Sequence, residues 1–375
     1  MMSGGYNMKK YKVKMGQIDF LLFATILLLV TIGVVMVYSA SSYYAAFKFN
    51  DPEYFLKKQF MWACIGGIFM VAAIKIDYHI IKKFTGIIMV VTIILLVVVF
   101  ACPATNGSKR WIPLGFANFQ PSEIAKYTIV LYMAKSLDLK GEKVKEFFKG
   151  IFPYLLVSGF YAGLILMEPN LSIAAVIMIV TVIILFAVGA KFFHLFAIGS
   201  SLVAAVGVAT ILAPYRMTRL MNFKNPFADS QGAGYQLVQS LLALGSGGIT
   251  GAGIGQSRQK CLYIPEPHTD FIFAIIGEEL GLIGCAFIIL LFIIFVWRGI
   301  KVAVTAKDMY GTILGIGITS VVTIQAVINI AVVTGSMPVT GVPLPFISYG
   351  GSALVFNMFA MGILLNVSRQ SINKN

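Results

Sequence analysis

The sequence predicts an all-α protein that crosses a membrane about ten times, with both termini in the cytoplasm. Of its 375 residues, 58% are hydrophobic and 12% are charged, and the charged share is about half that of a soluble domain. The mean hydropathy of +0.87 indicates more apolar surface than one soluble core could bury. Composition therefore excludes a soluble enzyme, a disordered chain and a disulfide scaffold, and leaves a polytopic helical membrane protein.

Ten apolar stretches approach or exceed the roughly 20 residues that a membrane helix needs. Four of them are long and uncharged: 20–38, 84–102, 171–190 and 309–333. Five are shorter or polar at one end: 60–74, 151–167, 192–213, 280–296 and 352–367. The tenth, 122–134, carries Glu123 and Lys126 near its start. Such unbroken runs are not barrel strands, which alternate apolar and polar residues over about ten positions.

Lysines and arginines predict the orientation, because cytoplasmic loops of membrane proteins are enriched in them. Most of the 29 residues of these two types lie in the termini and in the loops on the same side as the termini. We therefore expect one integral membrane domain over 1–375, with cytoplasmic tails at 1–17 and 368–375. The net charge of +14 is then mainly a signal of topology, and no nucleic-acid partner is expected.

Two segments on the outer side are too long to be simple connectors. They are 103–126 and 214–270, and the second is a large extracellular loop between the seventh and eighth predicted spans. Both contain aromatic residues, glycines and apolar runs, so we expect them to be ordered. The two segments are therefore predicted to form the functional site.

The first outer segment contains a basic and aromatic group followed by an acid and a base. Lys109, Arg110 and Trp111 are adjacent, and they can bind an anion and stack on a sugar or a cation, or simply anchor the chain at the membrane boundary. We expect a helix to begin near Pro121. Glu123 and Lys126 are three residues apart, so they share one face of this helix. Charges at the mouth of a span serve a site or form a structural ion pair.

The second outer segment contains a glycine-rich run, 245–255. It lacks the GKS/T ending and the G-x-G-x-x-G spacing of phosphate loops, and no strand precedes it. We therefore reject a phosphate loop and expect close backbone packing or a hinge. The stretch before it, 235–244, is amphipathic and suited to lying along the membrane interface.

The sharpest candidate is Asp270, within YIPEPHTDFIFAIIGEELG at 263–281. With Thr269 as the expected N-cap, Asp270 lies in the first turn of a helix at the outer membrane boundary. It could merely complement the helix dipole there. Because Glu266 and His268 crowd the same place and could tune the pKa of Asp270, a functional role is favoured.

These segments give the chain a specific resemblance. The sequences NGSKRWIPLGFANFQPSEIAK at 106–126, GYQLVQSLLALGSGGITGAGIGQSRQKCLYIPEPHTDFIFAIIGEELG at 234–281 and INIAVVTGSMPVTGVPLPFISYGGS at 328–352 resemble the SEDS family, the group of FtsW, RodA and SpoVE. The resemblance covers essentially the whole chain. GQSRQK, EPHTDFIFA and LLNVSR look closest to the FtsW and SpoVE branch.

The resemblance implies a ten-helix peptidoglycan glycosyltransferase in the bacterial cytoplasmic membrane. Such enzymes polymerise lipid II, an undecaprenyl-pyrophosphate-linked disaccharide peptide, at the outer face during cell division or spore cortex synthesis. Implied partners are a class B penicillin-binding protein transpeptidase and other divisome or sporulation membrane proteins. Asp270 matches the family's essential aspartate, Trp111 its aromatic residue after the basic pair, and Lys126 its lysine after PSE.

The chain departs from the family's pattern in two places. The family usually has Gln-Pro-Asp where this chain has Glu168-Pro169-Asn170, which casts doubt on a metal or substrate role for this turn. Ser336 replaces an aliphatic residue, with an expected effect on packing only.

The reaction needs a base near the acceptor hydroxyl and positive charge near the departing pyrophosphate. We expect Asp270 to be the catalytic base. The predicted substrate-binding residues are Lys109, Arg110, Trp111, Glu123, Lys126, Arg216, Arg258, Glu266 and His268. A divalent cation, Mg²⁺ or Mn²⁺, could share the charge, although no metal-ligand spacing is visible in the sequence.

Two functions of other classes stay open at this point. A lipid II flippase would need a polar site near the membrane midplane, for which Glu278, Glu279, Gln325 and Asn329 are candidates. A non-catalytic scaffold for a penicillin-binding protein would not need Asp270.

Overall fold

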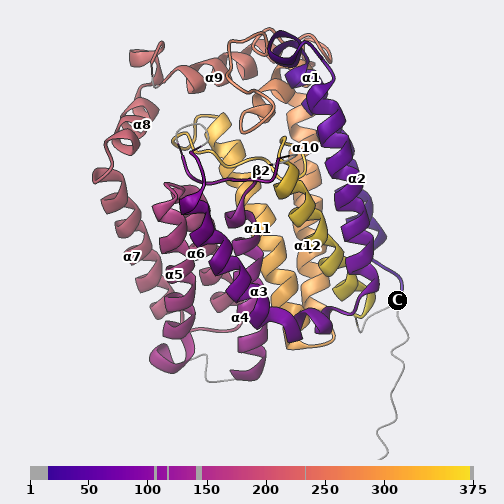
Figure 1. Cartoon of the computed structure of the whole chain (residues 1–375), viewed down its shortest axis with the longest axis vertical. Helices are drawn as coiled ribbons and strands as arrows, with labels where there is room; N and C mark the ends of the chain where they lie inside the picture. Colours follow the sequence, from indigo (N-terminus) through magenta and orange to yellow (C-terminus); the bar gives the residue numbers. More distant parts are fainter. Residues whose placement is uncertain (1–15, 105–107, 116–117, 141–145, 233, 372–375) are drawn as a thin grey trace, which may run out of the picture.

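A computed structural model describes residues 16–104, 108–115, 118–140, 146–232 and 234–371, and it is a bundle of long helices (Figure 1). The long helices are α1 (Phe20–Phe49), α2 (Tyr54–Lys75), α3 (Tyr78–Val98), α4 (Pro121–Lys140), α5 (Phe152–Met167), α6 (Leu171–Ala187), α7 (Phe192–Ile211), α10 (Ile272–Val304), α11 (Met309–Val333) and α12 (Gly351–Arg369). The short elements are η1 (Val99–Ala101), β1 (Ile112–Pro113), β2 (Asn118–Phe119), η3 (Phe147–Ile151), α8 (Pro214–Lys224), η4 (Pro226–Asp229) and α9 (Tyr235–Gly247). β1 and β2 pair antiparallel, with Ile112 opposite Phe119.

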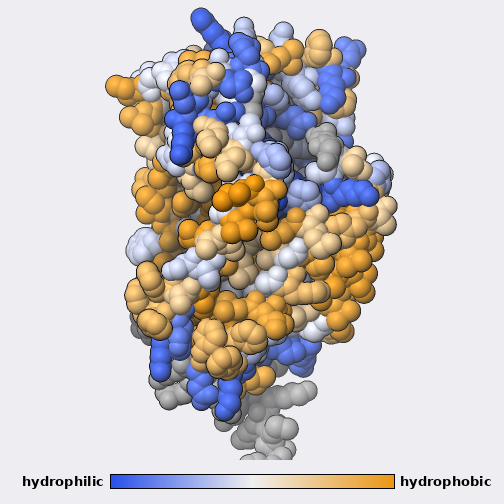
Figure 2. Space-filling model, turned by 90° about the vertical axis from the view of Figure 1, so that its left-hand side faces the viewer, coloured by the Kyte–Doolittle hydropathy of each residue, from blue (hydrophilic) through white to orange (hydrophobic). Residues whose placement is uncertain are grey.

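The surface has the pattern of a membrane protein. On the face that Figure 2 shows, hydrophobic residues predominate in the middle of the molecule and hydrophilic residues gather at its two ends. Within the described residues, eight helices are long and apolar enough to cross a membrane. Of the other two long helices, α6 is apolar but shorter, and α4 carries the charged residues that its sequence predicted. The helical membrane fold is confirmed, and the count of ten crossings stays a prediction.

The two described ends of the chain lie together, as the predicted topology requires. The amide of Gly16 donates to the carbonyl of Arg369 over 3.0 Å. Asp19, the N-cap of α1, forms an ion pair with Arg298 of α10, and its amide donates to Ser368 Oγ over 3.1 Å. These contacts join the ends of α1, α10 and α12 at one end of the bundle.

α10 is longer than the predicted span 280–296, and it is broken at Gly281. The backbone of Gly281 has φ 65° and ψ −164°, a conformation that glycine tolerates better than other residues. The carbonyls of Glu278 and Glu279 accept hydrogen bonds from the amides of residues 252 and 253, over 3.0 and 2.9 Å. On the other side of the break, the amides of residues 282 and 283 donate to the carbonyls of residues 248 and 249.

The glycine-rich run therefore pairs with the broken helix through its backbone. A Cβ atom added to Gly251 would lie 2.2 Å from the carbonyl oxygen of Glu279, so only glycine fits this approach. The prediction of close backbone packing in 245–255 is confirmed. The amphipathic stretch before it forms α9, which packs against α10.

Candidate functional site

Asp270 lies directly before α10, at the outer end of the bundle. Its carboxylate is partly buried and its Oδ1 accepts a hydrogen bond of 2.8 Å from Thr269 Oγ1. The N-cap of α10 is Phe271, so the predicted N-cap role of Thr269 is wrong. The hydroxyl of Thr269 is directed to Asp270 and to the carbonyl of Glu266 instead of capping the helix.

The main chain at Asp270 is bound by a side chain of α11. Asn329 Nδ2 donates to the carbonyl of Asp270 over 2.7 Å and to that of Val342 over 2.8 Å. From the sequence, Asn329 is only a candidate for the polar site of a flippase. No local pattern shows this role, because the contact joins residues 59 positions apart.

Burial raises the pKa of the Asp270 carboxyl, while the hydrogen bond from Thr269 and the positive charge of Arg219 act against this rise. Arg219 lies on α8 and was not among the predicted site residues. Its guanidinium donates to the carbonyl of Val339 over 3.4 Å, which brings it next to the segment that covers Asp270.

Arg219 belongs to a group of arginines from separate segments. Arg110 donates through its guanidinium to the main-chain carbonyls of Glu168 and Pro169. Burial lowers the pKa of Arg110, and the positive charges of Arg219 and Arg216 lower it further. The charges of Arg216 and Arg219 thus act on Arg110, and the charge of Arg219 also acts on Asp270. Of these arginines, Arg110 and Arg216 were predicted from the sequence.

Three other predicted residues lie at the rim of the outer segments. Lys109 is exposed, and its ammonium donates to the carbonyl of Phe100 over 3.0 Å. Trp111 is partly buried directly before β1. Arg258 has an exposed side chain, while its amide donates to Glu278 over 2.8 Å. Their contacts with substrate stay predictions.

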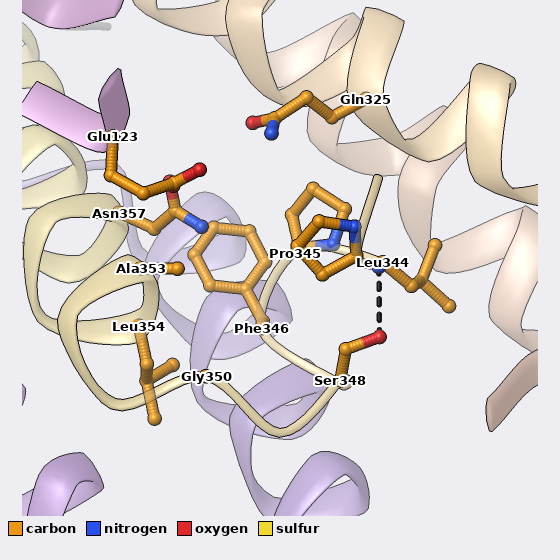
Figure 3. Close-up of a pocket in the computed structure, with 11 residues that line it drawn as sticks. Glu123, Gln325, Leu344, Pro345, Phe346, Ser348, Gly350, Ala353, Leu354 and Asn357 are labelled. Atoms are coloured by element: carbon orange, nitrogen blue, oxygen red, sulfur yellow. Dashed lines mark hydrogen bonds between the residues drawn. The ribbon is translucent and has the colours of Figure 1, made fainter. Parts of the chain in front are cut away.

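Glu123 and Lys126 form an ion pair inside the protein. Lys126 Nζ lies 2.8 Å from Glu123 Oε2, and both side chains are at most 2% exposed. α4 begins at Pro121, as predicted. Figure 3 shows Glu123 and Gln325 lining the same small pocket, beside the segment that leads into α12.

His268 is a core residue of an aromatic cluster. Its ring centroid lies 4.1 Å from that of Phe55 and 5.4 Å from that of Tyr349, and the residue is 2% exposed. Burial lowers the pKa of His268 to about 3, so the ring is neutral at physiological pH. Thr269 and Arg219 affect the pKa of Asp270, which is a correction to the expectation that Glu266 and His268 tune it.

The two glutamates of α10 have partners in the outer loop and in α1. Glu279 accepts from Ser39 Oγ over 2.6 Å and from Lys260 Nζ over 2.9 Å. Glu278 accepts from Ser257 Oγ over 2.5 Å and from the amide of residue 258. From the sequence, these carboxylates are candidates for a flippase site, and the structure identifies them as anchors of the 257–260 segment.

Glu168, at the departure from the family's pattern, is fully buried, and in the described part of the chain neither carboxylate oxygen has a hydrogen-bond partner. Burial raises its pKa from about 4.5 to about 8, against the opposing charge of Arg110. The carboxyl group is therefore mostly protonated at neutral pH. No three His, Cys, Asp or Glu side chains are grouped to hold a metal in the residues that the structure describes.

We expect Glu168 to make stability depend on pH. Between about pH 4.5 and 8 the folded state binds more protons than the unfolded state, so stability falls as pH rises, by at most about 4–5 kcal/mol. Glu168→Gln should remove this dependence and raise the melting temperature at pH 8, measured by thermal unfolding in detergent. Glu146→Gln, at an exposed site, is the control. A melting temperature of Glu168→Gln that still falls over this range would refute the assignment.

The chain is similar to known proteins over nearly its whole length. The model of the family described as "Cell cycle protein", FTSW_RODA_SPOVE, matches residues 19–373. "Stage V sporulation protein E" of Bacillus subtilis (strain 168) is 44% identical over 357 residues, which cover 94% of this chain and 97% of that protein. "Probable peptidoglycan glycosyltransferase FtsW" of Geobacter sp. (strain M18) is 42% identical over 355 residues, covering 93% and 96%.

Two solved structures share the fold. A chain from a peptidoglycan synthase complex, described for its coordination of polymerization and crosslinking, has a TM-score of 0.78 at 24% identity, covering 95% of this chain and 99% of that one. The rod shape determining protein RodA of Thermus thermophilus has a TM-score of 0.70 at 23% identity, covering 95% and 98%.

Proposed function

The chain belongs to the FtsW/RodA/SpoVE family of cell cycle proteins, and we propose on this basis that it polymerises lipid II into glycan strands. It is a peptidoglycan glycosyltransferase and a multi-pass protein of the bacterial cytoplasmic membrane. Of the two relatives above, one is named for sporulation and the other is a probable peptidoglycan glycosyltransferase FtsW, so we propose that this chain acts in cell division or in spore cortex synthesis.

One observation carries the mechanism: Asp270, a carboxylate directly before α10, lies where the positive charge of Arg219 acts on it. The 4-hydroxyl of the acceptor sugar attacks the anomeric carbon of the sugar on undecaprenyl pyrophosphate. The hydroxyl proton moves to Asp270 as the new C–O bond forms, and the bond to the pyrophosphate oxygen breaks with its electron pair leaving on that oxygen.

The departing pyrophosphate gains negative charge, which fixed cations stabilise. Arg216 and Arg219 of α8 and Arg110 of the first outer segment come from two places in the chain. The charges of Arg216 and Arg219 act on Arg110, so the three residues suit this task together. Lys109 and Arg258 have accessible side chains and extend the basic surface. Trp111 is proposed to stack on a sugar ring.

The remaining members of the predicted binding set have less direct roles. Lys126 neutralises Glu123 within the protein, and Glu266 and His268 shape the loop that carries Asp270. We assign all four to support of the site, with a direct substrate contact still to be measured for each.

A related structure comes from a peptidoglycan synthase complex, which supports a partner for this chain. We propose a class B penicillin-binding protein transpeptidase that crosslinks the strands as they are made. Other membrane proteins of the divisome or of sporulation complete the proposed set of partners.

The transport alternative is weakened by what its candidate residues do. Glu278 and Glu279 anchor an outer loop, and Asn329 donates to two main-chain carbonyls. These groups are committed to contacts within the protein, whereas a translocation path needs polar groups that face the substrate.

One assay separates the three functions. The purified protein, alone and with its transpeptidase partner, is given labelled lipid II in detergent, and polymer is measured on a gel. We expect glycan polymer to form. Parallel reactions with a chelator, with Mg²⁺ and with Mn²⁺ measure whether the rate of polymer formation depends on a divalent cation. A flippase or a scaffold would form none, since detergent removes the two sides of the membrane and a scaffold has no chemistry.

A further inference from the structure

The segment between α11 and α12 is fastened to the segment that carries Asp270 through buried side chains. Asn329 of α11 is 1% exposed, and its amide nitrogen donates to the carbonyls of Asp270 and Val342. One side chain thus joins the backbone beside the base to the backbone of the following loop. A planar amide with two N–H groups suits this task because it can serve two carbonyls at once.

A second hydrogen bond between the two segments is made at Thr269, the residue before Asp270. Ser348 Oγ donates to the carbonyl of Thr269 over 2.5 Å and accepts from the amide of Leu344 over 2.8 Å. The amide of Tyr349 adds a main-chain hydrogen bond of 2.8 Å to the carbonyl of His268. Three consecutive carbonyls, from 268 to 270, therefore bind to α11 and to the loop before α12.

These contacts matter for Asp270 because its own carboxylate is restrained by few partners. The hydrogen bond to its side chain comes from Thr269, the preceding residue, so the place of the carboxylate follows the backbone at 269–270. Asn329 also keeps a buried Oδ1 that has no hydrogen-bond partner in the described structure. A buried polar atom without a partner costs free energy, so this amide is not explained by stability alone.

We propose that Asn329 and Ser348 are positioning residues that hold the backbone of Asp270 so that its carboxylate meets the acceptor hydroxyl. This inference rests on the proposed function, in which Asp270 is the base. It places part of the active site in the 342–349 loop, more than 70 residues after the base in the sequence. A displaced catalytic group lowers the rate of the chemical step, and a shift of about 1 Å can cost about 10²-fold.

The other end of the bundle offers matched controls. Asn366 of α12 is fully buried, and its amide donates to the carbonyls of Ala73, Ile74 and Ile76. Ser368 is buried, accepts from the amide of Asp19 and donates to the carbonyl of Leu365. Each control makes the same type of contact as Asn329 or Ser348, on the side of the membrane away from Asp270.

The experiment measures kcat and KM for lipid II in Asn329→Asp and Ser348→Ala, beside Asn366→Asp and Ser368→Ala. Rates are expressed per folded molecule, from the monodisperse fraction in detergent. Asn329→Asp keeps the shape of the side chain but loses both N–H donors. We expect its kcat to fall about 10²-fold and that of Ser348→Ala about tenfold, with KM within about twofold of the parent, while both controls keep their kcat.

Two results overturn the proposal: a kcat of Asn329→Asp and Ser348→Ala no lower than that of their controls, or a loss confined to KM. If Asn329→Asp does not fold, Ser348→Ala alone decides, because it removes a single donor. Asp270→Asn is measured in the same series. Full activity of Asp270→Asn refutes the base itself, whereas its inactivity together with unaffected Asn329 and Ser348 variants refutes only the positioning role.

Discussion

Asp270→Asn is expected to lose polymerisation of lipid II by about 10²–10⁴-fold, the usual contribution of a general base. Asparagine has the same shape and its side-chain oxygen still accepts the hydrogen bond of Thr269, so the protein should fold as before. The loss then reports chemistry rather than structure. It is measured as the initial rate of polymer formation with purified protein and labelled lipid II.

The pH profile gives this prediction a second readout. The base acts in its ionised form, and burial raises the pKa of Asp270, so the rate should rise with pH until the carboxyl is ionised. This rise belongs to Asp270 and should be missing from the residual rate of Asp270→Asn.

Asp51→Asn serves as the matched control, since Asp51 is a carboxylate on the α1–α2 turn that is paired with Lys57. It should keep the full rate and the same pH profile. An Asp270→Asn protein as active as this control would eliminate Asp270 as the base and assign the proton transfer to another group of the site.

Lys126→Met is expected to give the largest change in stability. It leaves the carboxylate of Glu123 buried without its partner, which costs about 3–5 kcal/mol when one member of a buried ion pair is removed. The double variant Glu123→Gln/Lys126→Met replaces both charges by neutral groups of similar size and should recover most of this loss. Thermal unfolding in detergent measures both.

The exposed pair of Lys57 with Asp51 supplies the comparison, because Lys57→Met should cost no more than about 1 kcal/mol at the surface. Activity of the double variant then separates two roles for the buried pair. A stable and active double variant shows that the pair is structural, and a stable but inactive one shows that the site needs its charges. If the single variant Lys126→Met is as stable as the parent, Glu123 is not left as a buried, unpaired carboxylate, and the prediction is wrong.

The helical membrane fold could be predicted from the sequence because lipid selects for long apolar runs, and this signal is local. The limits of α10 were predicted less well: the span 280–296 is the apolar part of a helix that begins at Ile272. Glu278 and Glu279 weaken the hydropathy there. Their burial in the bundle depends on partners outside the helix, which are Ser257 for Glu278 and Ser39 and Lys260 for Glu279.

The site was predicted in part for the same reason. Asp270 lies in a recognisable motif, so it could be identified in advance. Arg219 is one arginine among several on an outer loop, and nothing local distinguishes it from Arg216 or Arg258. Asn329 and Ser348 act on a backbone that the fold brings to them, and such contacts between distant parts of the chain are not visible in a single sequence.

The break in α10 bears on how this protein enters its membrane. At Gly281 four main-chain hydrogen bonds are made with the glycine-rich run rather than along the helix. In lipid, a polar main-chain group without a partner costs several kcal/mol, so we expect the broken form of α10 to arise only when residues 248–253 supply these partners. The final conformation of this membrane helix would then be set jointly by the helix and by the loop translated just before it.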